Sequence, residues 1–176
     1  MGGVDKALIE IAGTTMLDRV LAAAAPHCDD LVVVGPVRPT ALDVVRFTIE
    51  EERGGGPVPG VAAGLAEVPA ADAVVVLAVD LPLLEADCIA TLFEGLHEAE
   101  AVAAIDHRGG PNPLLAAYRA DVLRAAAERL GPGAAATHLL PPNTVTVDLG
   151  QAGFNVNEPD DLERARQLHA KRDSPQ

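Results

Sequence analysis

Two charged residues of this 176-residue chain, Asp80 and Lys6, stand where metal and phosphate chemistry could take place. Asp80 directly follows residues 73–79, an unbroken apolar run that predicts a buried strand. In open α/β sheets ligands bind beyond the carboxyl ends of the strands, so a ligand is expected near this carboxylate. A turn-forming role before Leu81 and Pro82 is equally open from position alone. Mg²⁺ typically takes one or two carboxylates together with phosphate oxygens, so a single aspartate would be sufficient.

Lys6 is a weaker signal by itself, because a single lysine is usually a solvated surface charge. Of the 13 basic residues, however, only Lys6 and Lys171 are lysine, and Lys171 lies near the polar end of the chain. All the other basic residues are arginine, which indicates that position 6 requires the compact point charge of a lysine. Gly2 and Gly3 precede it, and glycine lets backbone amides come close to a phosphate.

A third candidate is the glycine- and proline-rich loop at residues 54–60, between an expected strand and an expected helix. Such a loop could form a base or phosphate pocket at the amino end of the helix. A plain connection is an equally open interpretation.

Several classes of site are excluded or disfavoured. The only serine, Ser174, lies near the carboxyl end, which excludes a serine nucleophile. The five histidines have neither HxH nor HExxH spacing, which argues against a zinc site. Neither the GxxxxGK[ST] phosphate loop nor a GxGxxG motif after a strand is present.

Composition predicts a cytoplasmic protein without nucleic-acid or membrane partners. The formal net charge is −13, which repels both nucleic acid and anionic membranes. Cys28 and Cys88 do not form a CxxC pair, which favours reduced thiols. There is also no uncharged apolar stretch of about 18 residues, the length that a membrane-spanning helix needs.

Apolar runs alternate with helix-like stretches along the chain, which predicts an α/β fold with a parallel sheet between two helical layers. We expect one domain over residues 1–170 and a polar tail over 171–176. The expected strands are residues 7–11, 31–34, 46–50, 73–79, 102–105, 114–118 and 145–147. The expected helices start at Thr14 or Thr15, cover 61–67, 85–97 and 121–130, and run from a cap at Asn157 to about 169.

Five segments carry a family resemblance, in a fixed order. They are MGGVDK at 1–6, EEE at 50–52 followed by GPVPG at 56–60, VLAVDLP at 76–82, NPL at 112–114, and FNVNEPDDL at 154–162. Together they resemble the molybdenum cofactor guanylyltransferase family, the MobA-like nucleotidyltransferases, over residues 1 to about 165. The resemblance implies a three-layer α/β/α, Rossmann-like nucleotidyltransferase fold with a mostly parallel sheet.

For this chain the resemblance implies Mg²⁺-dependent transfer of GMP from GTP to the terminal phosphate of molybdopterin, with release of pyrophosphate. Lys6 would hold the nucleotide phosphates and Asp80 the Mg²⁺, as the catalytic pair. Asn155 and Asn157 would lie near the acceptor or the metal. The remaining nucleotide-binding residues would be Gly2, Gly3, Glu51, Gly56, Pro57 and Gly60. Other cofactor-assembly proteins or molybdoenzymes would be partners by family.

The family signature LAGGxxxRMGGxDK matches this chain only at its end, since Met1 stands where the first part of the signature would precede it. That first part includes a central strand, whose removal would expose the backbone edges of both neighbouring strands. We therefore expect the true translation start to lie upstream of Met1. Three alternatives stay open: a cytidylyltransferase, another nucleotidyltransferase of this fold, and a non-catalytic relative that binds the cofactor or a partner.

Overall fold

The computed structural model describes residues 5–50, 54–106 and 108–172. Its amino-terminal part is a short 3-10 turn, η1 (Lys6–Leu8), and a two-stranded hairpin of β1 (Glu10–Ile11) and β2 (Thr14–Thr15). The prediction of a strand over residues 7–11 is therefore wrong for its first half. The cause is local: the side chain of Asp5 accepts a hydrogen bond from the amide of Ala7 at 3.1 Å, which favours a turn.

Helix α1 (Met16–Ala24) confirms the helix start predicted at Thr14 or Thr15. The Oγ1 atom of Thr15 accepts a hydrogen bond from the amide of Asp18 at 3.0 Å, so Thr15 is the cap. This bond satisfies one of the amide groups that have no partner within the first helical turn.

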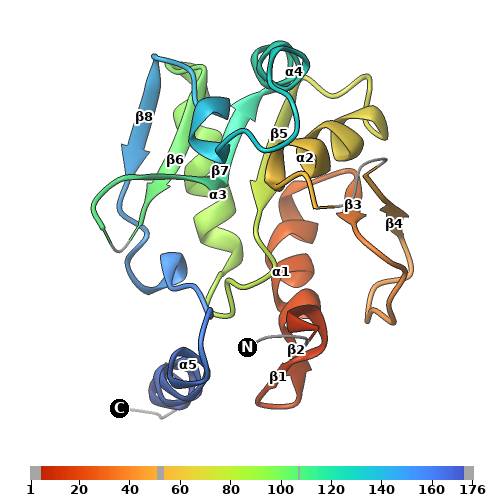
Figure 1. The fold of residues 1–176 in the computed structure, drawn as a ribbon. Coiled ribbons are helices and arrows are strands. Elements are labelled where there is room, and N and C mark those ends of the chain that lie inside the picture. The colour runs from red at the N-terminus through yellow and green to blue at the C-terminus, as the bar shows by residue number, and fades with distance from the viewer. Residues whose placement is uncertain (1–4, 51–53, 107, 173–176) are drawn as a thin grey trace.

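The strands form two larger groups, drawn side by side in Figure 1. In the first, β3 (Leu31–Val34) pairs in parallel with β4 (Val45–Thr48). The second has the order β5-β7-β6-β8, formed by β5 (Ala73–Leu77), β7 (Pro111–Arg119), β6 (Ala101–Ile105) and β8 (Thr144–Val147).

The α/β nucleotidyltransferase fold is confirmed, with a sheet that mixes parallel and antiparallel strands. β6 and β8 are parallel, whereas β7 runs antiparallel to both β5 and β6. Only residues 106–110 connect β6 to β7, and a parallel connection needs a crossover of a dozen or more residues. This short connection explains the direction of β7.

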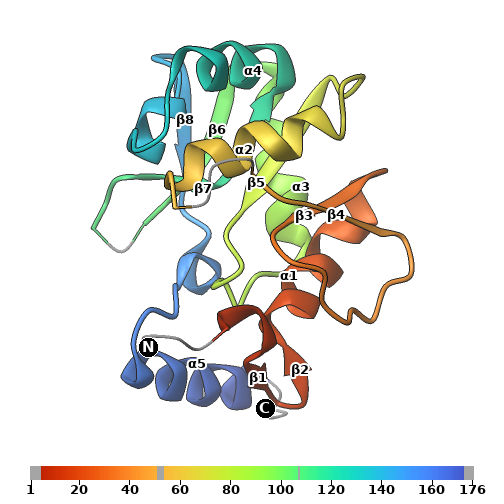
Figure 2. The same cartoon turned by 45° about the vertical axis from the view of Figure 1, so that its right-hand side comes forward.

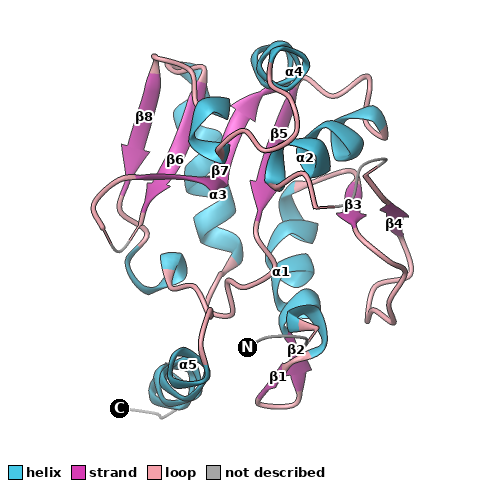
Figure 3. Cartoon of the chain, viewed as in Figure 1, coloured by secondary structure: helices cyan, strands magenta, loops and turns pink. Residues whose placement is uncertain are grey.

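Helices cover both faces of the strands (Figure 3). On one side lie α1 and α3 (Ala86–Glu94), which share an apolar cluster with the four-stranded sheet. On the other side lie α2 (Pro57–Ala66) and α4 (Ala120–Arg129), which share a second cluster with the same sheet. The core consists mainly of alanine, valine, leucine and isoleucine.

The ends of several elements differ from the prediction. α2 begins at Pro57 rather than at residue 61, because proline suits the first position of a helix and Gly56 precedes it with a φ of 82°. The last helix, α5 (Pro159–Arg172), continues two residues into the predicted tail. Figure 2 shows α5 beside the amino-terminal hairpin, so both ends of the described chain lie at the same end of the fold. Among the described residues, no helix is both long and apolar enough to cross a membrane.

Candidate active site

Lys6, Asp80, Asn155 and Asn157 form one hydrogen-bonded cluster. The Lys6 Nζ donates to Asp80 Oδ2 at 3.0 Å and to Asn157 Oδ1 at 2.9 Å. The Asn155 Nδ2 donates to the other carboxylate oxygen, Asp80 Oδ1, at 2.9 Å. Four residues singled out from the sequence, separated by up to 151 positions, therefore meet at one place.

The carboxyl end of β5 positions Asp80, which lies three residues beyond the last strand residue, Leu77. The backbone carbonyl of Asp80 accepts a hydrogen bond from the amide of Val156 at 3.0 Å. This bond attaches the segment before α5 to the strand end, so that Asn155 and Asn157, on either side of Val156, lie next to the carboxylate. The location agrees with the general rule that ligands bind beyond strand carboxyl ends.

The start of α5 fixes Asn157 in a way that the sequence did not indicate. The Asp161 Oδ2 accepts hydrogen bonds from the amides of Asn157 and Glu158, at 3.0 and 2.9 Å. The amide oxygen of Asn157, expected to cap the helix, instead accepts from Lys6. Asp161 thus binds the backbone ahead of the helix and leaves the Asn157 side chain for the cluster.

Two residues that sequence reasoning missed, Asp5 and Arg38, hold the turn that carries Lys6. Asp5 Oδ1 accepts from the amide of Ala7, and Asp5 Oδ2 accepts from Arg38 Nε at 2.8 Å. This hydrogen bond from Arg38 holds the pKa of the Asp5 carboxyl below its usual value. Arg38 also donates to the carbonyl of Pro36 at 2.9 Å, so the loop after β3 supports the Lys6 turn.

The Lys6 and Asp80 side chains of the cluster are partly buried, and the cluster offers oxygen atoms that could bind a metal ion. The side chains of Lys6 and Asp80 are 29% and 17% exposed, so their ion pair is screened less than a surface pair. No group of three or more His, Cys, Asp or Glu side chains that could hold a metal occurs within the described residues. One carboxylate with neighbouring amide oxygens nevertheless suits Mg²⁺ when phosphate oxygens complete its coordination. Both oxygens of Asp80 accept hydrogen bonds here, so Lys6 would have to move from Oδ2 for a metal to bind there.

The remaining predicted site residues lie elsewhere or outside the description. Gly2, Gly3 and Glu51 are outside the described residues. Pro57 and Gly60 line the same cavity as Lys6 but are not part of its hydrogen-bonded cluster. Gly56 begins α2, and a Cβ added there would lie 3.9 Å from the carbonyl oxygen of Ala134. A base-binding role for this loop stays a prediction.

Comparison with known proteins identifies the family that this chain matches. The family model described as a MobA-like NTP transferase domain matches residues 1–142. The molybdenum cofactor guanylyltransferase of Cereibacter sphaeroides is 31% identical over 185 residues, which cover 97% of this chain and 91% of that protein. The probable molybdenum cofactor guanylyltransferase of Natronomonas pharaonis is 30% identical, over 95% of this chain and 91% of the relative. The match to the Bradyrhizobium sp. enzyme of the same name, at 33% identity, spans only about half (55%) of that protein.

Solved structures support the same fold. The molybdopterin-guanine dinucleotide biosynthesis protein A of Archaeoglobus fulgidus superposes with a TM-score of 0.73 at 23% identity, over 96% of this chain and 92% of that one. The 2-C-methyl-D-erythritol 4-phosphate cytidylyltransferase of Thermus thermophilus superposes with a TM-score of 0.72 at 21% identity, over 94% and 93% of the two chains. Proteins named for different nucleotides therefore share this architecture.

Proposed function

Because this chain belongs to the MobA-like NTP transferase family, we propose that it transfers GMP from GTP to the terminal phosphate of molybdopterin and releases pyrophosphate. The observation that supports this reaction most directly is the pair of Lys6 and Asp80, with a 3.0 Å separation at the carboxyl end of β5. It offers a cation for phosphate and a carboxylate for a metal within one cluster. The names of the relatives with 91% coverage favour GTP as the nucleotide.

In the proposed reaction an oxygen of the molybdopterin phosphate attacks the α-phosphorus of GTP. The bond from that phosphorus to the oxygen bridging to the β-phosphate breaks, and its electrons leave with pyrophosphate. A phosphate monoester has its second pKa near 6, so the nucleophile is largely ionised at neutral pH and needs no general base. The absence of a serine nucleophile from the sequence is consistent with this chemistry.

Positioning and charge neutralisation would supply most of the catalysis, as in other phosphoryl transfers. Lys6 would leave the carboxylate of Asp80 and bind the nucleotide phosphates. Asp80, oriented by Asn155, would then hold Mg²⁺, which neutralises phosphate charge when bound. Asn157 would keep the Lys6 ammonium near the cluster before the nucleotide arrives. Because the overall charge of −13 repels polyphosphate, this local cation is essential to the proposal.

The test is to incubate the purified chain with molybdopterin, Mg²⁺ and either GTP or CTP, and to measure pyrophosphate release. Asp80→Asn is the site variant, and Glu128→Gln is its matched control, because Glu128 is an exposed carboxylate on α4. We expect release with GTP, its loss in Asp80→Asn, and no change in Glu128→Gln. Faster release with CTP would reassign the nucleotide. No release with either nucleotide, both from this chain and from a version extended upstream of Met1, would favour a binding role. Cytoplasmic location and contacts with cofactor-assembly proteins or molybdoenzymes stay predictions.

A further inference from the structure

The Asn157 side chain has two possible uses at the start of α5. In the structure its Oδ1 accepts a hydrogen bond from the Lys6 Nζ at 2.9 Å. Asparagine is also among the residues that cap helices best, with its side-chain oxygen accepting from an amide of the first turn. The amide available for such a cap is that of Asp160, because Pro159 has no N–H. The contact with Lys6 therefore requires that the helix does not need Asn157 as its cap.

Asp161 satisfies the start of the helix in place of that cap. Its Oδ2 accepts from the amides of Asn157 and Glu158, at 3.0 and 2.9 Å. An acidic side chain at the third position of a helix that reaches back to an amide ahead of the helix forms half of a capping box. These two bonds hold the backbone at Asn157 and leave its side chain free to reach Lys6.

The helix itself is attached by contacts that do not involve Asp161. Val156 is 0% exposed and packs against α5, and its amide donates to the carbonyl of Asp80 at 3.0 Å. At the other end of α5, Arg172 donates to the carbonyl of Leu83 at 3.1 Å. Because both ends of α5 are held in this way, loss of the Asp161 carboxylate should leave the helix in place and change mainly the Asn157 side chain.

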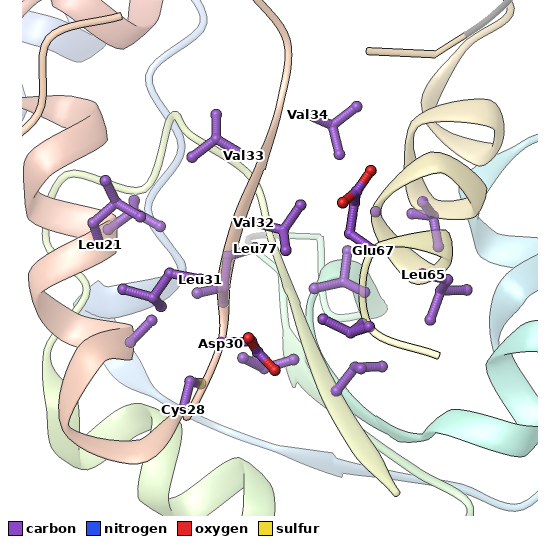
Figure 4. A pocket seen from close by; sticks show the side chains of 18 of the residues that line it. Leu21, Cys28, Asp30, Leu31, Val32, Val33, Val34, Leu65, Glu67 and Leu77 are labelled. Atoms are coloured by element: carbon purple, nitrogen blue, oxygen red, sulfur yellow. The ribbon is translucent and has the colours of Figure 1, made fainter. Parts of the chain in front are cut away.

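The position of the Lys6 ammonium depends on its two acceptors. Lys6 lines the large cavity beside β3 and β5, whereas Asp80 and Asn157 are not among the lining residues. The walls of this cavity are mainly aliphatic, as Figure 4 shows at Leu31 and Leu77. Aliphatic walls do not stabilise an ammonium group, so loss of the Asn157 contact would leave Lys6 with Asp80 and solvent.

We propose that Asp161 is a positioning residue: by binding the two amides ahead of α5, it keeps the Asn157 side chain turned toward Lys6 and so holds the ammonium beside Asp80. Without Asp161, Asn157 turns to cap α5 and Lys6 keeps one acceptor. Asp161 itself touches neither substrate nor metal. Its effect on turnover rests on the proposed function, whereas its effect on Lys6 can be measured without any reaction.

Four variants separate this role from a general effect on charge or folding. Asp161→Ala removes both hydrogen bonds, and Asp161→Asn removes the charge but keeps an oxygen that can accept from the same amides. Asp160→Ala is the matched control, because Asp160 is an exposed carboxylate in the same helical turn and the two amides donate to Asp161 instead. Asn157→Ala, alone and combined with Asp161→Ala, completes a double-mutant cycle.

The first measurement is the acetylation rate of Lys6, followed by peptide mass spectrometry with trace acetic anhydride. Lys6 and Lys171 are the only lysines of the chain, so Lys171 is an internal reference. Lys6 must leave both acceptors before it reacts, and Asp161→Ala leaves it only one. We therefore expect the Lys6 rate to rise at least about threefold in Asp161→Ala and to stay at the parent value in Asp161→Asn and in the Asp160 control. The Lys171 rate should not change.

The second measurement combines pyrophosphate release with thermal unfolding. Asp161→Ala should lower kcat/KM about tenfold, and Asp161→Asn should stay within about threefold of the parent. In the Asn157→Ala background, Asp161→Ala should cause no further fall in kcat/KM. It should nevertheless lower Tm by at least the 2–4 °C or so expected for loss of a helix cap, because no asparagine remains to replace it.

Three results would overturn the positioning role. One is an unchanged Lys6 acetylation rate in Asp161→Ala. Another is an equal rise in Asp160→Ala, which would assign the effect to lost charge rather than to the two hydrogen bonds. The third is an equal fall in kcat/KM with and without the Asn157 side chain, which would make Asp161 a folding residue only. Absence of pyrophosphate release from every protein would contradict the proposed function, and the Lys6 rates would still decide the role of Asp161.

Discussion

Replacing Lys6 by methionine removes the ammonium group and keeps a side chain of similar length. In the structure this ammonium donates two hydrogen bonds, at 3.0 Å to Asp80 and at 2.9 Å to Asn157. Hydrogen bonds to charged groups contribute about 1.5–3 kcal/mol when buried, and exposed ion pairs about 0.2–1 kcal/mol. Because the Lys6 side chain is 29% exposed, the expected loss of unfolding free energy is between these limits, about 1–2 kcal/mol.

Such a loss hardly changes the amount of folded protein. A domain with roughly 5–15 kcal/mol of stability stays more than about 99% folded after losing 2 kcal/mol. Stability therefore cannot account for a large fall in activity. If Lys6 binds the nucleotide phosphates in the reaction, kcat/KM should fall about 100-fold or more, which corresponds to about 2.7 kcal/mol of transition-state stabilisation.

Two measurements on the same preparation separate these effects: urea unfolding for stability and pyrophosphate release for kcat/KM. Lys171→Met is the matched control, because the same substitution is made at the exposed end of α5. It should change stability by less than about 0.5 kcal/mol and leave activity unaltered. A folded Lys6→Met protein with kcat/KM within twofold of the parent would refute the role of Lys6 in phosphate binding.

Three further changes have defined outcomes. Asp80→Asn should lower kcat by about 100-fold and weaken the dependence of pyrophosphate release on Mg²⁺ concentration. Arg38→Met should lower Tm at pH 7. Arg38 lowers the pKa of the Asp5 carboxyl, so their ion pair stabilises the folded protein above about pH 4, and this stabilisation is lost as the pH falls through the folded-state pKa of Asp5. The thermal melts of parent and variant should therefore converge in acid. Tyr118→Phe should cost about 1 kcal/mol in urea unfolding, because the buried hydroxyl donates to the carbonyl of Pro113 at 2.9 Å; an unchanged midpoint would exclude that contribution.

Lys6 and Asp80 could be selected as candidate site residues from the sequence, because each stands out by position or residue type without knowledge of the fold. Asp80 follows an unmistakable apolar strand, and Lys6 is a rare lysine in an arginine-rich set. The support from Arg38 could not be predicted in the same way, since arginine is the usual cation of this chain and carries no signal by type. Its partner Asp5 is a local turn former, whose effect competed with the apolar pattern of residues 7–11 and prevailed.

The direction of β7 illustrates a different limit. Periodicity identifies a strand but not its orientation, and the expected alternation of strands and helices favoured a parallel sheet. Orientation could have been inferred from the short connection at residues 106–110, which cannot contain a crossover. The pairing of Asn157 with Lys6 was beyond any local pattern, because it depends on where the two ends of the chain meet.

Because Lys6 and Asn157 lie near opposite ends of the described chain, their contact can form only late in synthesis. Lys6 emerges from the ribosome first and Asp80 follows, but Asn157 is 151 residues behind Lys6. Since translation adds roughly 5–20 residues per second, the cluster lacks its last member for about 8–30 s after Lys6 is made. Cluster formation therefore requires synthesis of the chain as far as the start of α5, and nascent chains that end before Asn155 cannot assemble it.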